Sequence, residues 1–458
     1  MKGLITTIKN IWKIKELRDR ILYTLALLFV FRLGSHILLP GVIPGALKNA
    51  IGGSGNANDL IGLINIFTGG AFNNSAILAL GVMPYITASI IIQLLGFAVP
   101  YFQRLQQKEG ESGRRKLNQL TRLLTVAITL VQGGAYLTYL ASVNAVDPGL
   151  SRQVFFIANI IVLSAGTVFS MWLGERITDK GIGNGISLLI MIGIIAALPS
   201  ALIFEFQNRF GAGGLLVFAM EIVGLFAIVL ATVAIVQAVR RIPVQFAKRM
   251  VGREAGNIPQ AGARDYIPLK VNAAGVMPII FAQAIMFLPA TIVQFLSGND
   301  AEATSSSLLR SLNDFTSLPY NLLYFILIVG FTYVYTALLV NPQQYSEYLK
   351  RQNAFIPGIK PGSSTAEFID SVTTRITLPG SIFLGFIAIF PAIAAGFGVN
   401  QGFALFFGGT SLLILVGVVL DTLQQIESYL LMRKYDGLVK AGKLKGRSGG
   451  MQPIGSQF

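Results

Sequence analysis

Long hydrophobic runs, separated by short polar segments, fill most of this 458-residue chain. Ten of the runs are about twenty residues long, the length that a helix needs to cross the hydrocarbon core of a membrane. They cover residues 21–39, 76–99, 123–141, 154–173, 185–204, 215–239, 275–296, 319–340, 378–395 and 403–420. The pattern predicts an all-α membrane protein with ten transmembrane helices.

The ten runs form two successive sets of five. We therefore expect an N-terminal segment, a first five-helix half, an external connection, a second five-helix half and a C-terminal tail. Their residues are 1–20, 21–204, 205–214, 215–420 and 421–458. Two long polar loops, 240–272 and 342–377, belong to the second half. The run 21–39 is too long for the core of a signal peptide, so we expect it to be retained as a span.

Positive charge is distributed unevenly between the two sides of these spans. The alternate connections that share a side with the termini hold 31 of the 36 lysines and arginines, and the other connections hold four. The remaining one, Arg32, lies inside the first run. Because positive charge accumulates on the cytoplasmic side, we expect both termini and the charged loops to be cytoplasmic.

Composition narrows the class of protein further. Charged residues make up 12% of the chain, about half their share in soluble domains. The chain has no cysteine and one histidine, which excludes disulfides and Cys/His zinc sites. His36 has no evident catalytic partner, and we interpret it as a packed or interfacial residue rather than a catalytic one.

The tetrapeptide GVMP occurs twice, at 81–84 and 275–278. A repeat this short can arise by chance, so its position decides its meaning. Each copy opens the second span of a five-span half. An odd number of spans places successive halves in opposite orientations, which is typical of inverted repeats with a functional path at their interface. Glycine followed by proline also suits a helix start.

A short apolar stretch precedes the first GVMP. Residues 60–67 cover only two helical turns, too few to cross a bilayer, and Gly69 and Gly70 end the stretch. One interpretation is a re-entrant helix, spanning about 60–74, that packs back into the protein. An amphipathic helix at the membrane interface is the alternative.

The spans contain almost no ionisable side chains, although carriers and pumps need them to bind or relay charge. Apart from Arg32 and His36, the notable ones are Glu221 and Asp421. A bundle without a charged site can still conduct when a narrow apolar constriction closes it. A secondary transporter and an intramembrane enzyme remain as alternatives from other classes.

The two cytoplasmic loops are rich in cations. The segment 240–270 carries seven cations and two acids, and 341–364 carries three cations. Such loops attract lipid head groups, an acidic protein or RNA phosphates, or they serve only to set orientation. The stretch GIGNG at 181–185 does not follow a strand, so it does not indicate nucleotide binding.

Several stretches together resemble the SecY family, the central subunit of the protein-conducting translocation channel. They are FTGGA and LGVMPYITASIIIQLL (67–95), EGESGRRK (109–116), MWLGERITDKGIGNGIS (171–187), YIPLKVNAAGVMP (266–278), NPQQYSEYLKRQNAFIPGIKPG (341–362) and FGGTSLLILVGVVLDT (407–422). Their order and spacing across ten spans make the resemblance specific.

The resemblance implies an hourglass pore between the halves, closed by an apolar ring and a plug, with a lateral gate between the second and seventh spans. By motif position the ring would be Val82, Ile86, Ile190, Ile280 and Ile414. The plug would contain Ile64, Ile66, Phe67, Gly69 and Gly70, and the gate would contain Thr87, Gln93 and Gln283. Valine at 82 is smaller than the isoleucine often found there.

The resemblance also implies partners. Lys248, Arg249, Arg253 and Lys360 would dock the ribosome or the SecA motor ATPase. The family usually has arginine at position 360, and lysine keeps the charge but loses the planar fork. SecE and SecG would be small membrane subunits, and signal sequences, nascent polypeptides and lipids would contact the channel. We expect a non-enzymatic protein of the bacterial cytoplasmic membrane, without a cofactor or a bound metal.

Overall fold

The structure is a computed structural model of the chain. It describes residues 14–47, 67–107, 110–211, 214–246, 264–283, 285–286 and 316–440, together with Trp12 and Asn65. The predicted span 275–296 and the predicted plug helix therefore lie partly outside the described residues. The predicted docking residues Lys248, Arg249 and Arg253 lie outside them completely.

The described residues are mostly helical, as predicted. The helices are α2 (Lys15–Gly34), α5 (Met83–Ala98), α6 (Pro100–Gln107), α7 (Gly110–Ser142), α8 (Arg152–Lys180), α9 (Gly185–Gly211), α10 (Leu215–Gln237), α13 (Leu318–Leu339), α14 (Pro342–Arg351), α15 (Ser363–Gly396), α16 (Gln401–Ala404) and α17 (Gly409–Lys440). Residues 277–283 and 285–286 are also helical. Among the described residues, seven helices are long and apolar enough to cross a membrane, namely α7, α8, α9, α10, α13, α15 and α17.

Large apolar side chains cover the outside of the bundle. On α10, for example, Leu216, Met220 and Val223 are 77%, 68% and 69% exposed. In water such a surface would drive association, whereas hydrocarbon solvates it at no cost. The exposed face of this helix therefore fits a lipid environment.

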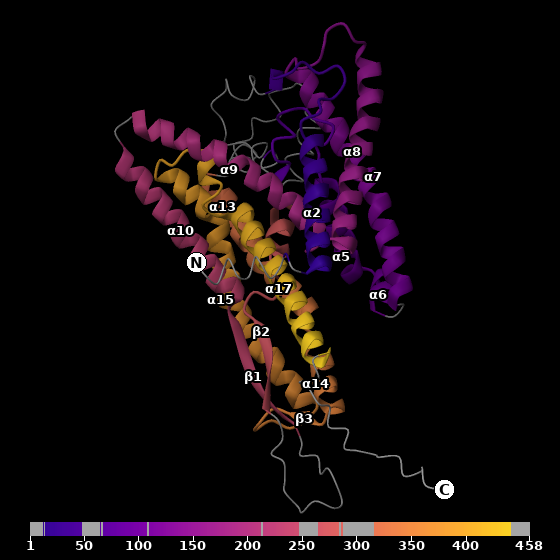
Figure 1. Cartoon of the computed structure of the whole chain (residues 1–458), viewed down its shortest axis with the longest axis vertical. Helices are drawn as coiled ribbons and strands as arrows, with labels where there is room; N and C mark the ends of the chain where they lie inside the picture. The colour runs from indigo at the N-terminus through magenta and orange to yellow at the C-terminus, as the bar shows by residue number, and fades with distance from the viewer. Residues whose placement is uncertain are drawn as a thin grey trace, which may run out of the picture.

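A small three-stranded sheet lies at one end of the molecule, beside α14 (Figure 1). The order is β2-β1-β3, from β1 (Val239–Phe246), β2 (Arg264–Lys270) and β3 (Ala354–Phe355), and both pairings are antiparallel. Buried residues of the sheet pack with Leu349 of α14 and Ile369 of α15. We call this end of the molecule the sheet end.

The all-α expectation therefore needs one correction, because the two predicted polar loops contribute strands. The segment VRRIPVQF alternates in burial, with Ile242 and Val244 facing the small core. Pro243 disfavours helix and also removes a backbone donor. It is tolerated because β3 pairs only with Gln245 and Phe246, so β1 has a free edge at Pro243.

The GIGNG stretch forms the turn between α8 and α9. The Ile182 N–H donates to the Thr24 hydroxyl on α2 at 3.1 Å, and the Gly183 N–H donates to the Gln425 side chain on α17 at 2.8 Å. The turn thus joins the first described helix to the last one. Its backbone N–H groups serve this junction.

A buried charge cluster joins the C-terminal end of α9 to the N-terminal part of α10, far from the sheet end. Arg209 contacts Glu205 at 2.9 Å and Glu221 at 2.7 Å. It also donates to the Gly398 carbonyl at 2.6 Å, while Glu205 accepts from the Asn400 N–H at 3.2 Å. Both carboxylates are almost completely buried, so a single arginine compensates two negative charges.

We expect Arg209→Met to lower the free energy of unfolding by about 3–5 kcal/mol, the usual cost of removing one partner from a buried ion pair. Denaturant or thermal unfolding in detergent micelles measures this change. Arg115→Met is the matched control, because Arg115 pairs with Glu111 through side chains that are 78% and 82% exposed. That pair contributes about 1 kcal/mol at most. Equal, small effects of both variants would contradict the assignment.

Candidate functional site

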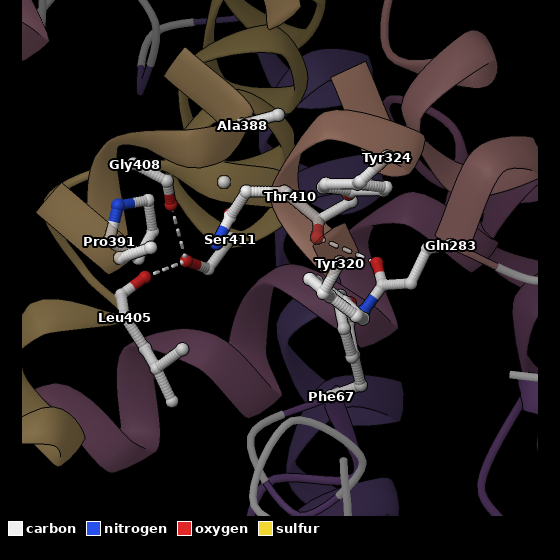
Figure 2. Close-up of a pocket in the computed structure, with 13 residues that line it drawn as sticks. Phe67, Gln283, Tyr320, Tyr324, Ala388, Pro391, Leu405, Gly408, Thr410 and Ser411 are labelled. Carbon is white, nitrogen blue, oxygen red and sulfur yellow. Dashed lines mark hydrogen bonds between the residues drawn. The ribbon is translucent and has the colours of Figure 1, made fainter. Parts of the chain in front are cut away.

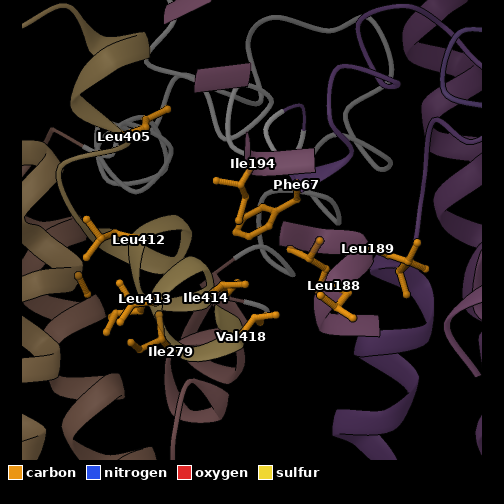
Figure 3. Packing of buried hydrophobic residues seen from close by; sticks show 14 of the residues in the cluster. Phe67, Leu188, Leu189, Ile194, Ile279, Leu405, Leu412, Leu413, Ile414 and Val418 are labelled. Atoms are coloured by element: carbon orange, nitrogen blue, oxygen red, sulfur yellow. The ribbon is translucent and has the colours of Figure 1, made fainter. Parts of the chain in front are cut away.

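The five predicted ring residues lie together in one apolar cluster at the centre of the bundle. Val82, Ile190 and Ile414 are buried members of this cluster, and Ile86 and Ile280 are partly buried against it. Figure 3 shows Ile414 of α17 on one side of the cluster and Leu188 of α9 on the other. The cluster is built of aliphatic and aromatic side chains, including Tyr320 and Tyr324.

Equivalent backbone turns position two of these residues. Gly81 and Gly275, the first residues of the two GVMP copies, have φ angles of 52° and 65°. This left-handed conformation is easy for glycine alone. Helix α5 then begins at Met83, and the second helix begins at residue 277, the methionine of its own copy. The repeat is therefore structural, since both copies start a helix in the same way.

The two starts also carry equivalent ring residues. Ile86 and Ile280 each lie five residues after the first glycine of their GVMP copy. Both contact the same central cluster. Comparing the two copies residue by residue could have revealed this match from sequence alone.

Residues 67–76, which are mostly turns, overlap the predicted plug at about 60–74; we call them the turn segment. Phe67 is 8% exposed and belongs to the central cluster, where Figure 3 shows it beside Ile194. The Tyr136 hydroxyl on α7 donates to the Phe72 carbonyl at 2.8 Å. Gly69 and Gly70 have φ angles of 65° and 87°. Ile64 and Ile66 lie outside the described residues.

The predicted gate residues do not bond to one another. Thr87 donates to the Met83 carbonyl of its own helix at 3.1 Å. Gln93 of α5 instead accepts from the Tyr335 hydroxyl of α13 at 3.1 Å. Phe281 of the second GVMP helix packs against the same tyrosine in a tilted arrangement, with ring centroids 5.6 Å apart. Helix α13 therefore connects both GVMP helices, and sequence reasoning missed Tyr335.

Gln283 is buried and accepts from the Thr410 hydroxyl of α17 at 2.6 Å (Figure 2). The pair lines a cavity of about 30 Å³, which has room for about two water molecules. Its other walls include Phe67, Tyr320 and Tyr324. The turn segment thus adjoins a small, mostly apolar cavity that has the Gln283–Thr410 pair in its wall.

The remaining predicted docking residue, Lys360, is exposed at the sheet end, in the turn between β3 and α15. Lys350 and Arg351 of α14 are exposed nearby in sequence. His36 lies in an exposed turn just after α2. No group of three His, Cys, Asp or Glu residues that could hold a metal occurs in the described part of the chain.

The model of the SecY family matches residues 76–423 of this chain. "Protein translocase subunit SecY" of Streptomyces coelicolor is 43% identical over 448 residues, which cover 95% of this chain and 100% of that protein. The protein of the same name from Chlamydia muridarum is 40% identical over 468 residues, covering 97% of this chain and 100% of that protein.

Solved structures show the same fold. "The structure of a protein conducting channel" has a TM-score of 0.63 at 18% identity, covering 92% of this chain and 94% of that one. "Sec61 in the Canine ribosome-channel complex from the endoplasmic reticulum" has a TM-score of 0.58 at 18% identity, with the same two coverages. A third structure is described by the role of "the plug domain of the SecY protein", which stabilises "the closed state of the translocation channel". Its TM-score is 0.60 at 19% identity, covering 92% of this chain and 93% of that one.

The buried Gln283–Thr410 pair allows a test of the site geometry. We expect Thr410→Val to lower the free energy of unfolding by about 1–3 kcal/mol, because it leaves the amide oxygen of Gln283 without its donor. Adding Gln283→Leu should recover part of this loss, since both polar partners are then removed. A double-mutant cycle measured by thermal unfolding in detergent gives the coupling. Strictly additive effects would mean that the two side chains do not interact.

Proposed function

Because this chain belongs to the SecY family of protein translocase subunits, we propose that it is a passive gated channel for unfolded polypeptides. In this proposal it moves polypeptides across the membrane and releases transmembrane segments sideways into lipid. It catalyses no bond chemistry, and a bound motor ATPase or a translating ribosome supplies the energy. The observation that supports this most is the buried apolar cluster that joins Val82, Ile190 and Ile414 with Phe67.

An apolar cluster of this kind can act as a gate. Water leaves a narrow apolar ring spontaneously, so the ring blocks ions without a charged barrier. Ile86 and Ile280 are only partly buried, as expected of residues at the wall of a path. The turn segment would then be the plug, because Phe67 reaches the ring from a chain segment that is not a membrane helix.

The proposed topology has ten membrane helices in two inverted halves, with both termini in the cytoplasm of a bacterial cell. The equivalent helix starts at Gly81 and Gly275 support the repeat. The concentration of lysine and arginine in alternate connections supports the orientation. The sheet end would then be cytoplasmic.

The proposed lateral gate lies between α5 and the second GVMP helix. Residues Gln93 and Phe281, one from each helix, both contact Tyr335 of α13. Helix α13 would hold the two GVMP helices close together at rest. A signal sequence would part them and reach lipid between them.

The proposed partners are SecE, SecG, the SecA motor, the ribosome, signal sequences, nascent chains and membrane lipids. Ribosome docking gains support from the matched channel that is described in a ribosome complex. The exposed cations of the sheet end suit RNA phosphates or an acidic protein surface. A transporter is less well supported, because Arg209 compensates the buried carboxylates at one end of the bundle, away from the ring.

Replacing both Ile86 and Ile280 with serine should raise the resting ion conductance of reconstituted membranes at least several-fold, because hydroxyl groups keep the constriction wet. Planar-bilayer recording measures this leak. Ile157→Ser is the control, since Ile157 lies on α8 with 64% of its side chain exposed. Unchanged conductance in the double variant would argue against the ring assignment.

Charge reversal at Arg249 and Lys360 together should weaken binding of ribosomes or of the motor ATPase by about tenfold, because attraction becomes repulsion at the docking surface. Sedimentation with channel-containing vesicles measures the binding of each partner. Arg152→Glu is the control, because Arg152, the first residue of α8, is exposed on the side predicted to be external. Resting conductance should stay unchanged, and full binding by the double variant would remove the docking role.

A further inference from the structure

Arg32 is a cation near the C-terminal end of an apolar helix. Helix α2 ends at Gly34, and Arg32 is half-buried there. A charged side chain inside a membrane span is costly unless a partner compensates it. None of the ion pairs formed by the described residues includes Arg32. The partner of this charge must therefore be sought among neutral groups.

The guanidinium of Arg32 reaches the turn segment. Its Nη1 donates to the backbone carbonyl of Gly69, and it also lies 3.4 Å from the Ser35 hydroxyl. That hydroxyl donates in turn to the Arg32 carbonyl at 2.7 Å. The charge is thus directed at one carbonyl, 37 residues further along the chain. Hydrogen bonds that involve a charged group are about twice as strong as neutral ones.

Gly69 is enclosed on its other side by α9. A Cβ atom built on Gly69 would lie 2.8 Å from the Cα of Gly193, closer than any side chain tolerates. The left-handed φ angle of Gly69 would also strain any residue with a side chain at this position. The turn segment is therefore held at Gly69, between Arg32 of α2 and Gly193 of α9. Gly69 lies two residues after Phe67, which belongs to the central cluster.

A simpler role for Arg32 is to stabilise the end of its own helix. Cations in the last helical turn interact favourably with the free carbonyls of that turn. This role accounts for a basic residue at the position. It does not account for a guanidinium that donates to Gly69, and it predicts no effect on the turn segment.

We propose that Arg32 is a positioning residue that latches the turn segment in its closed place. The proposal rests on the proposed function, in which this segment is the plug of a channel. The bond between Arg32 and Gly69 is strong while the site is dry, because little water competes for either group. Once water enters the path, it solvates both groups and the bond contributes little. The latch therefore holds the resting state and weakens as soon as the channel opens.

Arg32→Gln tests the latch, because it removes the charge and keeps a hydrogen-bonding side chain. We expect about a tenfold rise in resting ion conductance, the population change that corresponds to about 1.4 kcal/mol. Arg32→Lys should restore part of the closed state. Arg152→Gln removes the same charge from an exposed side chain, that of the first residue of α8. It should leave the conductance at the wild-type value.

A cysteine reporter follows the turn segment directly. The chain has no cysteine of its own, and Ala71 is fully buried. In an Ala71→Cys background, Arg32→Gln should accelerate labelling by a membrane-impermeant thiol reagent about tenfold. A residue that only stabilises α2 would change the melting temperature without changing this labelling rate. Wild-type conductance together with wild-type labelling in Arg32→Gln would overturn the proposal.

Gly69→Ala tests the latch independently if Arg32→Gln fails to fold. It keeps the arginine but pushes the Gly69 carbonyl away through the contact with Gly193, so it should raise leak and labelling in the same direction. No change in either measurement would overturn the latch.

The double serine variant of Ile86 and Ile280 separates the two proposals. If that variant leaks and the Arg32 and Gly69 variants do not, only the latch fails. If none of these variants leaks, the proposed channel fails as well.

Discussion

The structure depends on apolar contact at its centre, where segments from distant parts of the chain meet. Val82, Ile190 and Ile414 come from three different elements and share one cluster with Phe67. Inside a bilayer there is no hydrophobic force to push helices together, so close packing holds such a centre in place. A centre of this composition excludes water and ions because it offers them no partner, and the same property leaves it without a preferred polar ligand.

Most of the buried polar groups around this centre find a partner elsewhere. Thr121, Thr125 and Thr129 of α7 donate to carbonyls one turn back in their own helix. The carboxylates of Glu205 and Glu221 share Arg209 at the ends of α9 and α10. Burial of such groups without a partner would cost several kcal/mol each. These contacts fix how the helices are joined.

Hydrophobic run length located the seven described helices that are long and apolar enough to cross a membrane, because a membrane helix must be apolar over its whole length. The same analysis missed the small sheet, since an alternating strand such as 239–246 is too short and too basic to stand out beside long apolar runs. The bond between Tyr335 and Gln93 was also missed. It joins residues that are 242 positions apart, and no local pattern marks such a pair. A tyrosine inside an apolar span does need a partner for its hydroxyl. That need indicates a hydrogen bond for Tyr335, but it does not identify Gln93 as the partner.

Two kinds of contact hold the proposed gate, and they respond differently to water. Apolar contacts are individually weak and have no direction, so the side chains of a passing polypeptide replace them readily. The bonds of Gln93, Gln283 and Arg32 are directional and strong only in dry surroundings. While the apolar cluster is closed, these bonds are protected and define one resting arrangement. Once a substrate separates the cluster and admits water, each bond loses most of its net free energy. We infer that opening begins at the apolar ring, and that the polar contacts follow because water then competes for them.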